Sequence, residues 1–275
     1  MIATTLTETA PTAGVPVPVA PGIRRLLAPN PGPMTYHGTN TWLVTGPRGT
    51  VVIDPGPDNA GHVQAILAAA PDISDILVTH HHHDHLGAAA ALKAATGVGI
   101  TAFHAAPHAD IPVADGDEVA GLRAIHTPGH ASDHLCFVRD GVLFSGDQAM
   151  SWSSTTISLP DGDMAAYVAS LRLLLGGEYR LLLPGHGPPH PQPRALLDYL
   201  LDHRLRREAL LVASMAERPA TANELTLRLY VGVDPRLVPA AERNVRAHLA
   251  KLAAEGRAAV DGDRWRSIPA ASVSA

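Results

Sequence analysis

The stretch DILVTHHHHDHLGAAAALKAATG, residues 75–97, decides how this chain folds. It opens with an apolar run, Asp75–His80, that is typical of a buried strand, and it closes with an alanine-rich helix, Leu86–Gly97, ended by glycine. Five histidines and one aspartate lie where the strand gives way to the helix. Because loops at the carboxyl ends of strands commonly carry the ligand sites of α/β proteins, this arrangement predicts a functional loop on an α/β scaffold.

Strands and helices alternate on both sides of this stretch, which therefore belongs to a larger α/β unit. Helical spacing predicts helices at Ala60–Ala70 and Met164–Leu175. Strand pairs interleaved with helices indicate a layered α/β domain rather than an all-β sandwich. Short apolar runs bounded by Gly and Pro predict the strands Trp42–Gly46, Thr50–Gly56, Gly99–Phe103, Gly121–Thr127, His134–Val138, Gly141–Asp147 and Tyr179–Leu183.

The composition divides the chain into three parts. Residues 1–20 are rich in Thr, Ala and Pro, and we expect this N-terminal segment to be disordered. Residues 21–193 form the α/β domain, which we expect to be catalytic and which ends in a proline-rich stretch. Residues 194–275 predict a small winged-helix-like domain, with three helices and a hairpin at Leu196–Met215, Ala222–Tyr230, Ala240–Glu255 and Arg257–Ile268.

Charge and cysteine content bear on partners and compartment. The formal net charge is −5, and residues 1–194 carry 9 basic and 16 acidic side chains, so we expect no strong attraction to polyanions. The single cysteine, Cys136, excludes an intramolecular disulfide and fits a reducing compartment. The N-terminus lacks a signal-peptide pattern, and no apolar stretch reaches membrane-spanning length. We therefore expect a cytoplasmic protein with no membrane partner.

The histidine-rich loop has the composition of a metal site. Alternate residues of a tight loop point to the same side, so we expect His80 and His82 to bind one metal ion. Asp84 and His85 turn the other way and are expected to bind a second. Imidazole and carboxylate ligands without a thiolate suit Zn²⁺, and also Fe or Mn. The loop therefore predicts two divalent metal ions as cofactors, with zinc as the first choice.

Three further residues follow predicted strands and can complete two coordination spheres. His130 lies in HTPGHASDH, Asp147 in FSGDQAM and His186 in LLLPGHGP. An aspartate has two oxygens and can bridge two cations, which a histidine cannot do. Each short motif alone is more often a turn, but their order after the histidine-rich loop makes the set specific.

Together, HxHxDH, TPGH, SGD and LPGHG, preceded by the strand-end aspartate of VVIDPGP, resemble the metallo-β-lactamase fold superfamily over residues 24–193. The resemblance implies an αβ/βα sandwich with metals in a shallow cleft at the edges of two sheets. It also implies that Asp54 steadies the histidine-rich loop without touching metal. The implied ligands are His80, His82 and His130 for the first metal, Asp84, His85 and His186 for the second, and Asp147 as the bridge.

Details of the sequence narrow the choice within the superfamily. Asp147 argues against true β-lactamases, which lack the bridging aspartate, and His82 argues against flavodiiron proteins, which have Glu there. Asp147 and His186 are 39 positions apart, too few for the inserted cap of RNA-processing members. NPGPMTYHGTNTWLV and ERNVRAHLAKLAAEGRA look most like the β-lactamase-like protein 2 family, which is related to glyoxalase II and has a winged-helix-like tail.

These ligands predict a hydrolase that uses a metal-bound hydroxide, because two cations on one water lower its pKa toward neutrality. Asp84 is expected to be catalytic as well as a ligand, since its carboxylate would also hold the hydroxide. The leading substrate class is a small-molecule or acyl ester, thioester or lactone. A single-strand endoribonuclease with RNA as partner is the alternative that the resemblance offers, and a weak β-lactamase or a mononuclear-iron persulfide dioxygenase ranks lower. Whether the chain forms a homodimer stays open.

The sequence signals for substrate-binding residues are less specific than the motifs for metal ligands. Tyr36 and Asn40 lie in a loop that the resemblance places beside the cleft, although a Gly/Asn-rich turn explains them equally well. His134 follows His130 closely and is a third candidate, with a buried core histidine as the commoner reading. Residues 153–156 could form a second wall of the pocket, with an ordinary polar loop as the commoner reading.

The tail allows one function of a different class. Its third helix carries Arg243, Arg246 and Lys251, which suit a DNA-binding module with the hydrolase domain as sensor. Glu242 and Glu255 flank these cations, so the sequence ranks that reading below hydrolysis.

Overall fold

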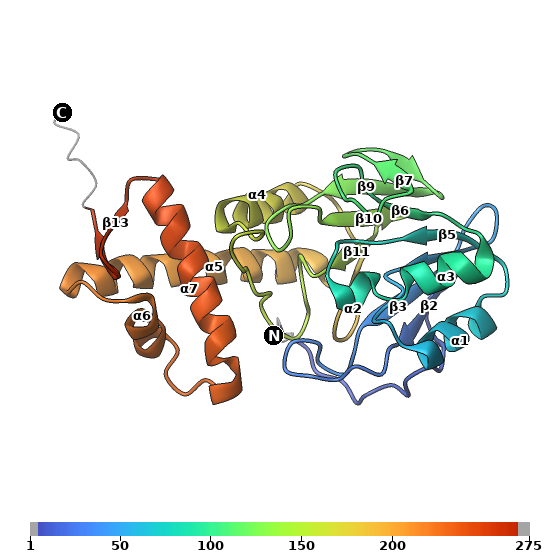
Figure 1. The fold of residues 1–275 in the computed structure, drawn as a ribbon, viewed down its shortest axis with the longest axis horizontal. Helices are drawn as coiled ribbons and strands as arrows, with labels where there is room; N and C mark the ends of the chain where they lie inside the picture. Colours follow the sequence, from blue (N-terminus) through green and yellow to red (C-terminus); the bar gives the residue numbers. More distant parts are fainter. Residues whose placement is uncertain (1–4, 269–275) are drawn as a thin grey trace.

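Two β-sheets lie face to face in the larger part of the molecule, which a computed structural model describes over residues 5–268 (Figure 1). Within these residues the first sheet has seven strands and the second has five. The spatial order of the first is β1 (Val17–Ala20), β2 (Ile23–Leu27), β3 (Asn40–Thr45), β4 (Thr50–Ile53), β5 (Ile73–Leu77), β6 (Ile100–Phe103) and β7 (Ile111–Val113). The spatial order of the second is β12 (Leu181–Pro184), β11 (Val142–Gly146), β10 (Leu135–Arg139), β9 (Leu122–His126) and β8 (Glu118–Val119).

Residues along a single strand alternate between two cores. In β4, Val51 and Ile53 belong to the core between the sheets, whereas Val52 belongs to the core on the outer face. In β11, Phe144 lies between the sheets and Leu143 on the outer side. Successive strand side chains point to opposite faces, so a strand that is buried on both faces reads as one continuous apolar run.

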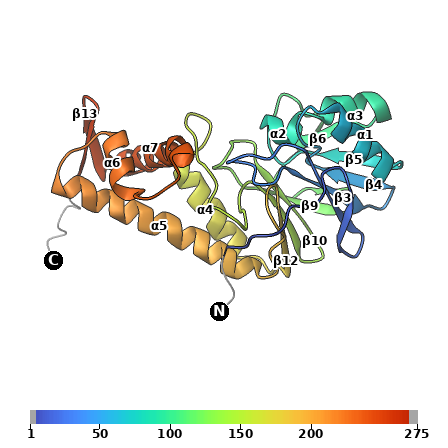
Figure 2. The ribbon, with the colours of Figure 1, turned by 90° about the horizontal axis from the view of Figure 1, so that it is seen from below.

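Helices cover the outer face of each sheet (Figure 2). The first sheet packs against α1 (Ala60–Ala69) and α3 (Ala89–Thr96). The second packs against α4 (Met164–Leu175) and the first half of α5 (Pro193–Glu217). The predicted αβ/βα sandwich is therefore confirmed.

The histidine-rich loop is shorter than the sequence indicated. The expected helix at 86–97 is two helices: α2 (His83–Leu86) begins inside the histidine run, and α3 follows after a break. Gly87 lies at the break, where an added Cβ would be 2.5 Å from the backbone nitrogen of Asp58. This close approach of two backbones requires glycine, and it presses the first turn after β5 against the loop after β4.

The N-terminal segment is ordered over residues 5–20, so the expectation of disorder is wrong there; residues 1–4 lie outside the described part. Strand β1 pairs with β2 in antiparallel register. Farther upstream, both carboxylate oxygens of Glu8 accept hydrogen bonds at 2.9 Å from the buried Arg25 guanidinium. The composition of this segment gave no sign of the pairing because the partners come from the folded domain, which supplies a strand edge and a buried cation.

The C-terminal part is a winged helix, as predicted. It contains α6 (Ala222–Leu229), a 3₁₀ turn at Pro235–Leu237, α7 (Val238–Ala254) and the hairpin of β13 (Ala258–Asp261) and β14 (Arg264–Ser267). No helix within residues 5–268 is long and apolar enough to cross a membrane.

Helix α5 joins the two parts of the molecule. It runs as one rod along both (Figure 1), which places the expected boundary at residues 193/194 at its first turn. Leu196 and Leu200 pack in the core outside the second sheet, whereas Leu211 and Met215 pack in the C-terminal core. The first half of α5 is thus part of the α/β domain, and the domains share a continuous helix instead of a flexible linker.

Candidate metal centre

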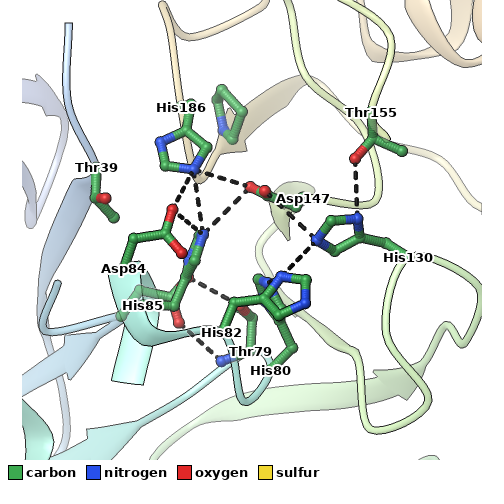
Figure 3. Close-up of polar contacts among 12 residues, drawn as sticks. Thr39, Thr79, His80, His82, Asp84, His85, His130, Asp147, Thr155 and His186 are labelled. Atoms are coloured by element: carbon green, nitrogen blue, oxygen red, sulfur yellow. Dashed lines mark hydrogen bonds and ion pairs between the residues drawn. The ribbon is translucent and has the colours of Figure 1, made fainter. Parts of the chain in front are cut away.

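Seven side chains from five separate segments converge at the carboxyl ends of the strands (Figure 3). Two follow β5, two lie on α2, and one each follows β9, β11 and β12. They are the residues that the motifs predicted: His80, His82, Asp84, His85, His130, Asp147 and His186.

The first group of ligand atoms is a triangle of ring nitrogens. Nδ1 of His82 lies 3.0 Å from Nε2 of His80 and 2.9 Å from Nε2 of His130. His80 directs its other nitrogen, Nδ1, to the Thr79 hydroxyl at 3.0 Å. His130 directs its Nδ1 to the Thr156 carbonyl at 2.8 Å, and a carbonyl can only accept. Nε2 of His130 is therefore a free lone pair when the ring is neutral, and it faces the triangle.

The second group combines two imidazoles and a carboxylate. Nε2 of His186 lies 3.1 Å from Oδ2 of Asp84 and 3.3 Å from Nε2 of His85. Asp84 is the most exposed member, with 31% of its side chain accessible, whereas both histidines are almost completely buried. The carboxylate therefore stands at the open side of the group.

Asp147 lies between the two groups. Its Oδ1 is 3.4 Å from Nε2 of His85 and 3.5 Å from Nε2 of His186. Its Oδ2 is 3.7 Å from Nε2 of His130. Oδ1 is buried and receives no hydrogen bond from the described residues. One carboxylate thus turns one oxygen to each group, the geometry expected of a bridging ligand.

Burial controls the protonation of the first group. It lowers the pKa of His80 well below its usual value, and the neighbouring His85 and His130 lower it further. Burial likewise lowers the pKa of His82 to about 4 and the pKa of His130 below its usual value. Neutral imidazoles offer lone pairs, which metal binding requires.

Ionised carboxylates control the protonation of the second group. Burial alone would raise the pKa of Asp147, but His186 and His85 outweigh it and hold that pKa well below the usual range. Burial would lower the pKa of His186, yet Asp147 and Asp84 raise it to about 9. The ionised carboxylates thus attract positive charge, which protons on His85 and His186 or metal ions can supply.

Asp54 lies behind His85, on the side away from the other candidate ligands. Its Oδ2 accepts hydrogen bonds from Nδ1 of His85 at 2.8 Å and from the Thr79 hydroxyl at 2.9 Å, and its Oδ1 accepts from the Thr79 backbone at 2.8 Å. Asp54 also has a positive φ of 53°, which turns the chain sharply after β4. The carboxylate fixes the ring of His85 with Nε2 toward the site and touches no other ligand directly.

Glycine allows His130 to reach the site. Gly129 has a φ of 140°, and a Cβ there would lie 2.3 Å from Cα of Tyr167 in α4. Any larger residue would push the turn away from α4. The TPGH motif therefore brings a turn into close contact with α4, and His130 directly follows the glycine that allows this contact.

His134 and Asn40, two low-ranked candidates for substrate contacts, are completely buried, as the commoner reading of His134 as a core histidine and the turn reading of Asn40 predicted. Nε2 of His134 lies 3.2 Å from the backbone nitrogen of Asp147, from which it accepts, so it positions the bridging residue. The Asn40 amide donates to the carbonyls of Pro184 and Gly187 at 3.0 and 2.8 Å and holds the turn that carries His186. Both side chains position candidate metal ligands and do not contact the substrate.

Tyr36, the third candidate, is occupied elsewhere. Its hydroxyl accepts a hydrogen bond at 3.1 Å from the Glu8 backbone, and its ring stacks on Trp152 with centroids 5.0 Å apart. It does not line the cleft beside the seven residues. The loop around Tyr36 is therefore a structural turn, and the Tyr36 side chain anchors the N-terminal segment.

A cleft of about 240 Å³ opens onto the seven residues. The sequence favoured an ordinary polar loop at 153–156, but Thr155 and Thr156 form part of the wall. Sequence reasoning missed Met34, Met150, Ser158 and Arg243, which line the same cleft. No motif marks these residues, and Arg243 had been considered only for DNA binding.

Helices α5 and α7 hold the segment that orients His130. The Asn244 side chain on α7 accepts a hydrogen bond at 2.8 Å from the Ile157 backbone nitrogen. The buried Arg204 on α5 donates to the Thr155 carbonyl. Residues 155–157 thus lie between His130 and the two tail helices.

Two sequence profiles match the chain. One, described as the metallo-β-lactamase superfamily, matches residues 34–114 and 105–186. The other, described as the β-lactamase-associated winged-helix domain, matches residues 221–265.

Curated relatives match nearly the whole length. A β-lactamase-like protein 2 homolog of Drosophila melanogaster is 30% identical, over 85% of this chain and 88% of the relative. An atrochrysone carboxyl ACP thioesterase of Aspergillus terreus is 30% identical, over 86% of this chain and 81% of the relative.

Solved structures agree with the fold. A β-lactamase domain protein from Burkholderia ambifaria superposes with a TM-score of 0.83 at 24% identity, covering 95% of this chain and 96% of that one. TTHA1623, solved in a di-iron-bound form, has a TM-score of 0.52 at 29% identity and covers 60% of this chain and 93% of its own. The chain therefore belongs to the metallo-β-lactamase superfamily, as a hydrolase of the group that carries the β-lactamase-associated winged-helix domain.

Proposed function

We propose that this protein is a dinuclear metal-dependent hydrolase of acyl thioesters. The observation that carries the proposal is the position of Asp147, with one oxygen toward His85 and His186 and the other toward His130. A carboxylate in that position can serve two cations at once.

The donor set fits metal ions better than it fits protons alone. If His80 and His130 are neutral and bonded through Nδ1, their Nε2 lone pairs both face the single Nδ1 of His82. One N–H on His82 can serve only one of them, which leaves a buried lone pair without a partner. A cation among the three nitrogens would satisfy all of them, and the unpartnered Oδ1 of Asp147 argues in the same way for the second group.

The ligand assignment follows the two groups. His80, His82 and His130 would hold one ion, Asp84, His85 and His186 the other, and Asp147 both. Nitrogen and carboxylate ligands suit zinc, and iron is supported by the di-iron form in which TTHA1623 was solved. Such ions, when bound, acidify water and polarise the oxygen of a carbonyl group.

The remaining chemistry belongs to the protein. Asp84 stands at the open side of the site and lines the cleft, so its carboxylate can orient an attacking water. Asp54, His134 and Asn40 hold ligands in place from behind, which lowers the reorganisation needed during reaction. No covalent intermediate on a protein side chain is required.

A thioester is the favoured substrate because two kinds of observation agree with it. The relatives include proteins named as acyl-carrier-protein thioesterases, one of them 30% identical over 86% of this chain. In addition, the acidic composition of residues 1–194 disfavours a long polyanion. Single-stranded RNA is the competing substrate, since the β-lactamase-like protein 2 resemblance includes such a branch.

Metal analysis tests the dinuclear part. We expect close to two ions per chain in the purified protein and about one in Asp147→Ala, because that variant lacks the shared ligand. Asp84→Ala should lose most turnover while its circular dichroism spectrum stays that of the wild type, since Asp84 is partly exposed on the short helix α2 and lies outside the hydrophobic core. A wild-type protein that binds a single ion at saturation would refute the dinuclear assignment.

A substrate screen at several salt concentrations tests the reaction. We expect metal-dependent hydrolysis of acyl thioesters that changes little with added salt. RNA cleavage depends on phosphate contacts and would fall steeply as salt rises, because bound counterions are released. Efficient cutting of single-stranded RNA at physiological salt, with no thioester turned over, would replace this proposal with a ribonuclease.

A further inference from the structure

A single arginine of the C-terminal domain reaches the cleft of the candidate metal centre. Arg243 lies on α7, whereas every other residue that lines this cleft comes from the α/β domain. We propose that Arg243 is a specificity-determining residue that binds an anionic group, a carboxylate or a phosphate, of the thioester substrate. The inference rests on the proposed thioesterase function and extends it to the class of substrate.

The guanidinium of Arg243 is available for a ligand. The residue is exposed, and it forms no hydrogen bond or ion pair with any residue in the part of the chain described, 5–268. Its neighbours on the same helix differ. Arg246 pairs with Glu242, and Lys251 pairs with Glu208 at 2.6 Å and with Glu255 at 2.8 Å.

The charge of the cleft points to an anion. Arg243 is the only Lys or Arg among the described residues that line it, and the acidic residues that line it are Asp84 and Asp147. Both carboxylates would be engaged by metal ions in the working enzyme. Arg243 would then face no free carboxylate in the cleft and would add to the positive charge of the ions, and a guanidinium is well shaped for two hydrogen bonds to a carboxylate or phosphate.

An apolar cavity adjoins the cleft and fits the acyl group. It has a volume of about 170 Å³ and shares Met34, Met150 and Thr156 with the cleft. The C-terminal domain contributes Val233 and Leu237 to its wall. An engineered apolar cavity of roughly 150 Å³ binds benzene, so this one has room for a chain or ring of about six carbons.

Arg243 and the apolar cavity meet at the cleft, where the C-terminal domain faces the α/β domain. A thioester whose carbonyl lies at Asp84 and Asp147 could place its apolar part between the domains and its anion beside Arg243. The anion can belong to the acyl group, as a terminal carboxylate, or to the thiol arm, as the phosphate of phosphopantetheine. Matched substrates separate these sources.

Steady-state kinetics on the metal-loaded full chain tests the proposal. The probes are the N-acetylcysteamine thioesters of hexanoate (neutral) and adipate (acyl carboxylate), and the hexanoyl thioesters of pantetheine (neutral) and phosphopantetheine (phosphate). We expect Arg243→Gln to raise KM about tenfold or more for one of the two charged probes, with kcat little changed. The two neutral probes should be unaffected, and Arg243→Lys should keep part of the preference.

The matched control is Arg246→Gln, which removes an arginine one turn along the same helix outside the cleft. It should leave all four KM values unchanged. The cavity is tested by Ala240→Leu, which narrows its wall and should lower kcat/KM for the hexanoyl probes severalfold but not for acetyl thioesters.

The outcomes separate this inference from the function on which it rests. If the wild type hydrolyses these thioesters but Arg243→Gln changes charged and neutral probes equally, or changes neither, Arg243 does not recognise an anion. If the metal-loaded wild type hydrolyses no thioester at all, the proposed function itself is wrong, and the role of Arg243 is withdrawn with it.

Discussion

At the scale of single residues, the site depends on side chains that never reach the cleft. Asp54 joins two consecutive parts of the histidine-rich loop, because one carboxylate accepts from both Thr79 and His85. A ring nitrogen that donates to a carboxylate leaves the other nitrogen as a stronger ligand. His134 and Asn40 position two other ligands: His134 accepts a hydrogen bond from the backbone of Asp147, and Asn40 donates to the backbone just before His186. The ligands are therefore oriented before any metal arrives.

We expect Asp54→Asn to lower metal affinity by about 10- to 100-fold, the usual cost of losing a partner behind a ligand. Asparagine keeps the size of the side chain and tolerates a positive φ, so the fold should survive. Competition with a chelator, read by metal analysis, measures the loss. Asp58→Asn is the control, because Asp58 is exposed in the same loop. Equal affinities in the two variants would remove Asp54 from this role.

At the scale of elements, the C-terminal domain is held to α5 by a buried carboxylate. Glu208 on α5 accepts a hydrogen bond from Lys251 on α7 at 2.6 Å and a second one from Arg257, which precedes β13. Burial would raise the pKa of Glu208, but hydrogen bonds from His248, Lys251 and Arg257 hold it well below the usual 4.5. The Glu208 carboxylate thus connects α5 to α7 and to the segment that leads into the β13–β14 hairpin.

The depressed pKa of Glu208 makes a prediction about pH. Stability from this group is complete above about pH 4.5, where the unfolded glutamate is ionised, and is lost as pH falls toward the lower folded pKa. We expect Glu208→Gln to cost about 2 kcal/mol of unfolding free energy at pH 7, measured by urea denaturation. The difference from wild type should shrink below about pH 4.5.

Glu217→Gln is the matched control, because Glu217 is exposed at the end of the same helix. It should change stability by less than about 0.5 kcal/mol at any pH. A Glu208→Gln effect that stays constant down to pH 3 would mean that the carboxylate charge contributes nothing.

At the scale of the whole molecule, the two domains complete one site. Helix α5 passes through both cores, and α7 lies against the loop that supports His130. The cleft draws Arg243 from α7, and the adjoining apolar cavity is lined from both sides. The winged helix therefore acts as part of the site wall. The other cations of α7, Arg246 and Lys251, are paired with acidic residues, which leaves little positive charge on this helix for DNA.

Asn244→Ala tests this coupling between domains. It removes the acceptor of the buried Ile157 nitrogen, so we expect a loss of about 1–2 kcal/mol in stability and a severalfold fall in kcat/KM. Asn223→Ala removes an exposed amide that donates to Glu242 and should do neither. Normal kinetics in Asn244→Ala would show that the tail does not support the His130 loop.

Much of the chemistry was readable from the sequence because metal ligands are local motifs. HHHHDH, TPGH, SGD and LPGHG each carry their ligand with the turn that presents it, and each follows an apolar run that identifies a strand. The layered α/β architecture followed from the same runs, since strands buried on both faces need helices on the outside, and the resemblance to the superfamily implied the two-sheet sandwich. The role of Asp54 was implied by the resemblance, which places an aspartate at the end of this strand in VVIDPGP.

What only the tertiary structure decided depends on burial and on contacts between distant segments. Asn40 and His134 have the chemistry of substrate contacts, yet both are buried behind the ligands, because the packing of the two sheets encloses them. The order of residues 5–20 depends on a strand edge and on Arg25. Arg243 reaches the cleft only because α5 carries the tail back against the α/β domain. Local patterns encode which side chains can bind a metal, but long-range packing selects which ones face the substrate.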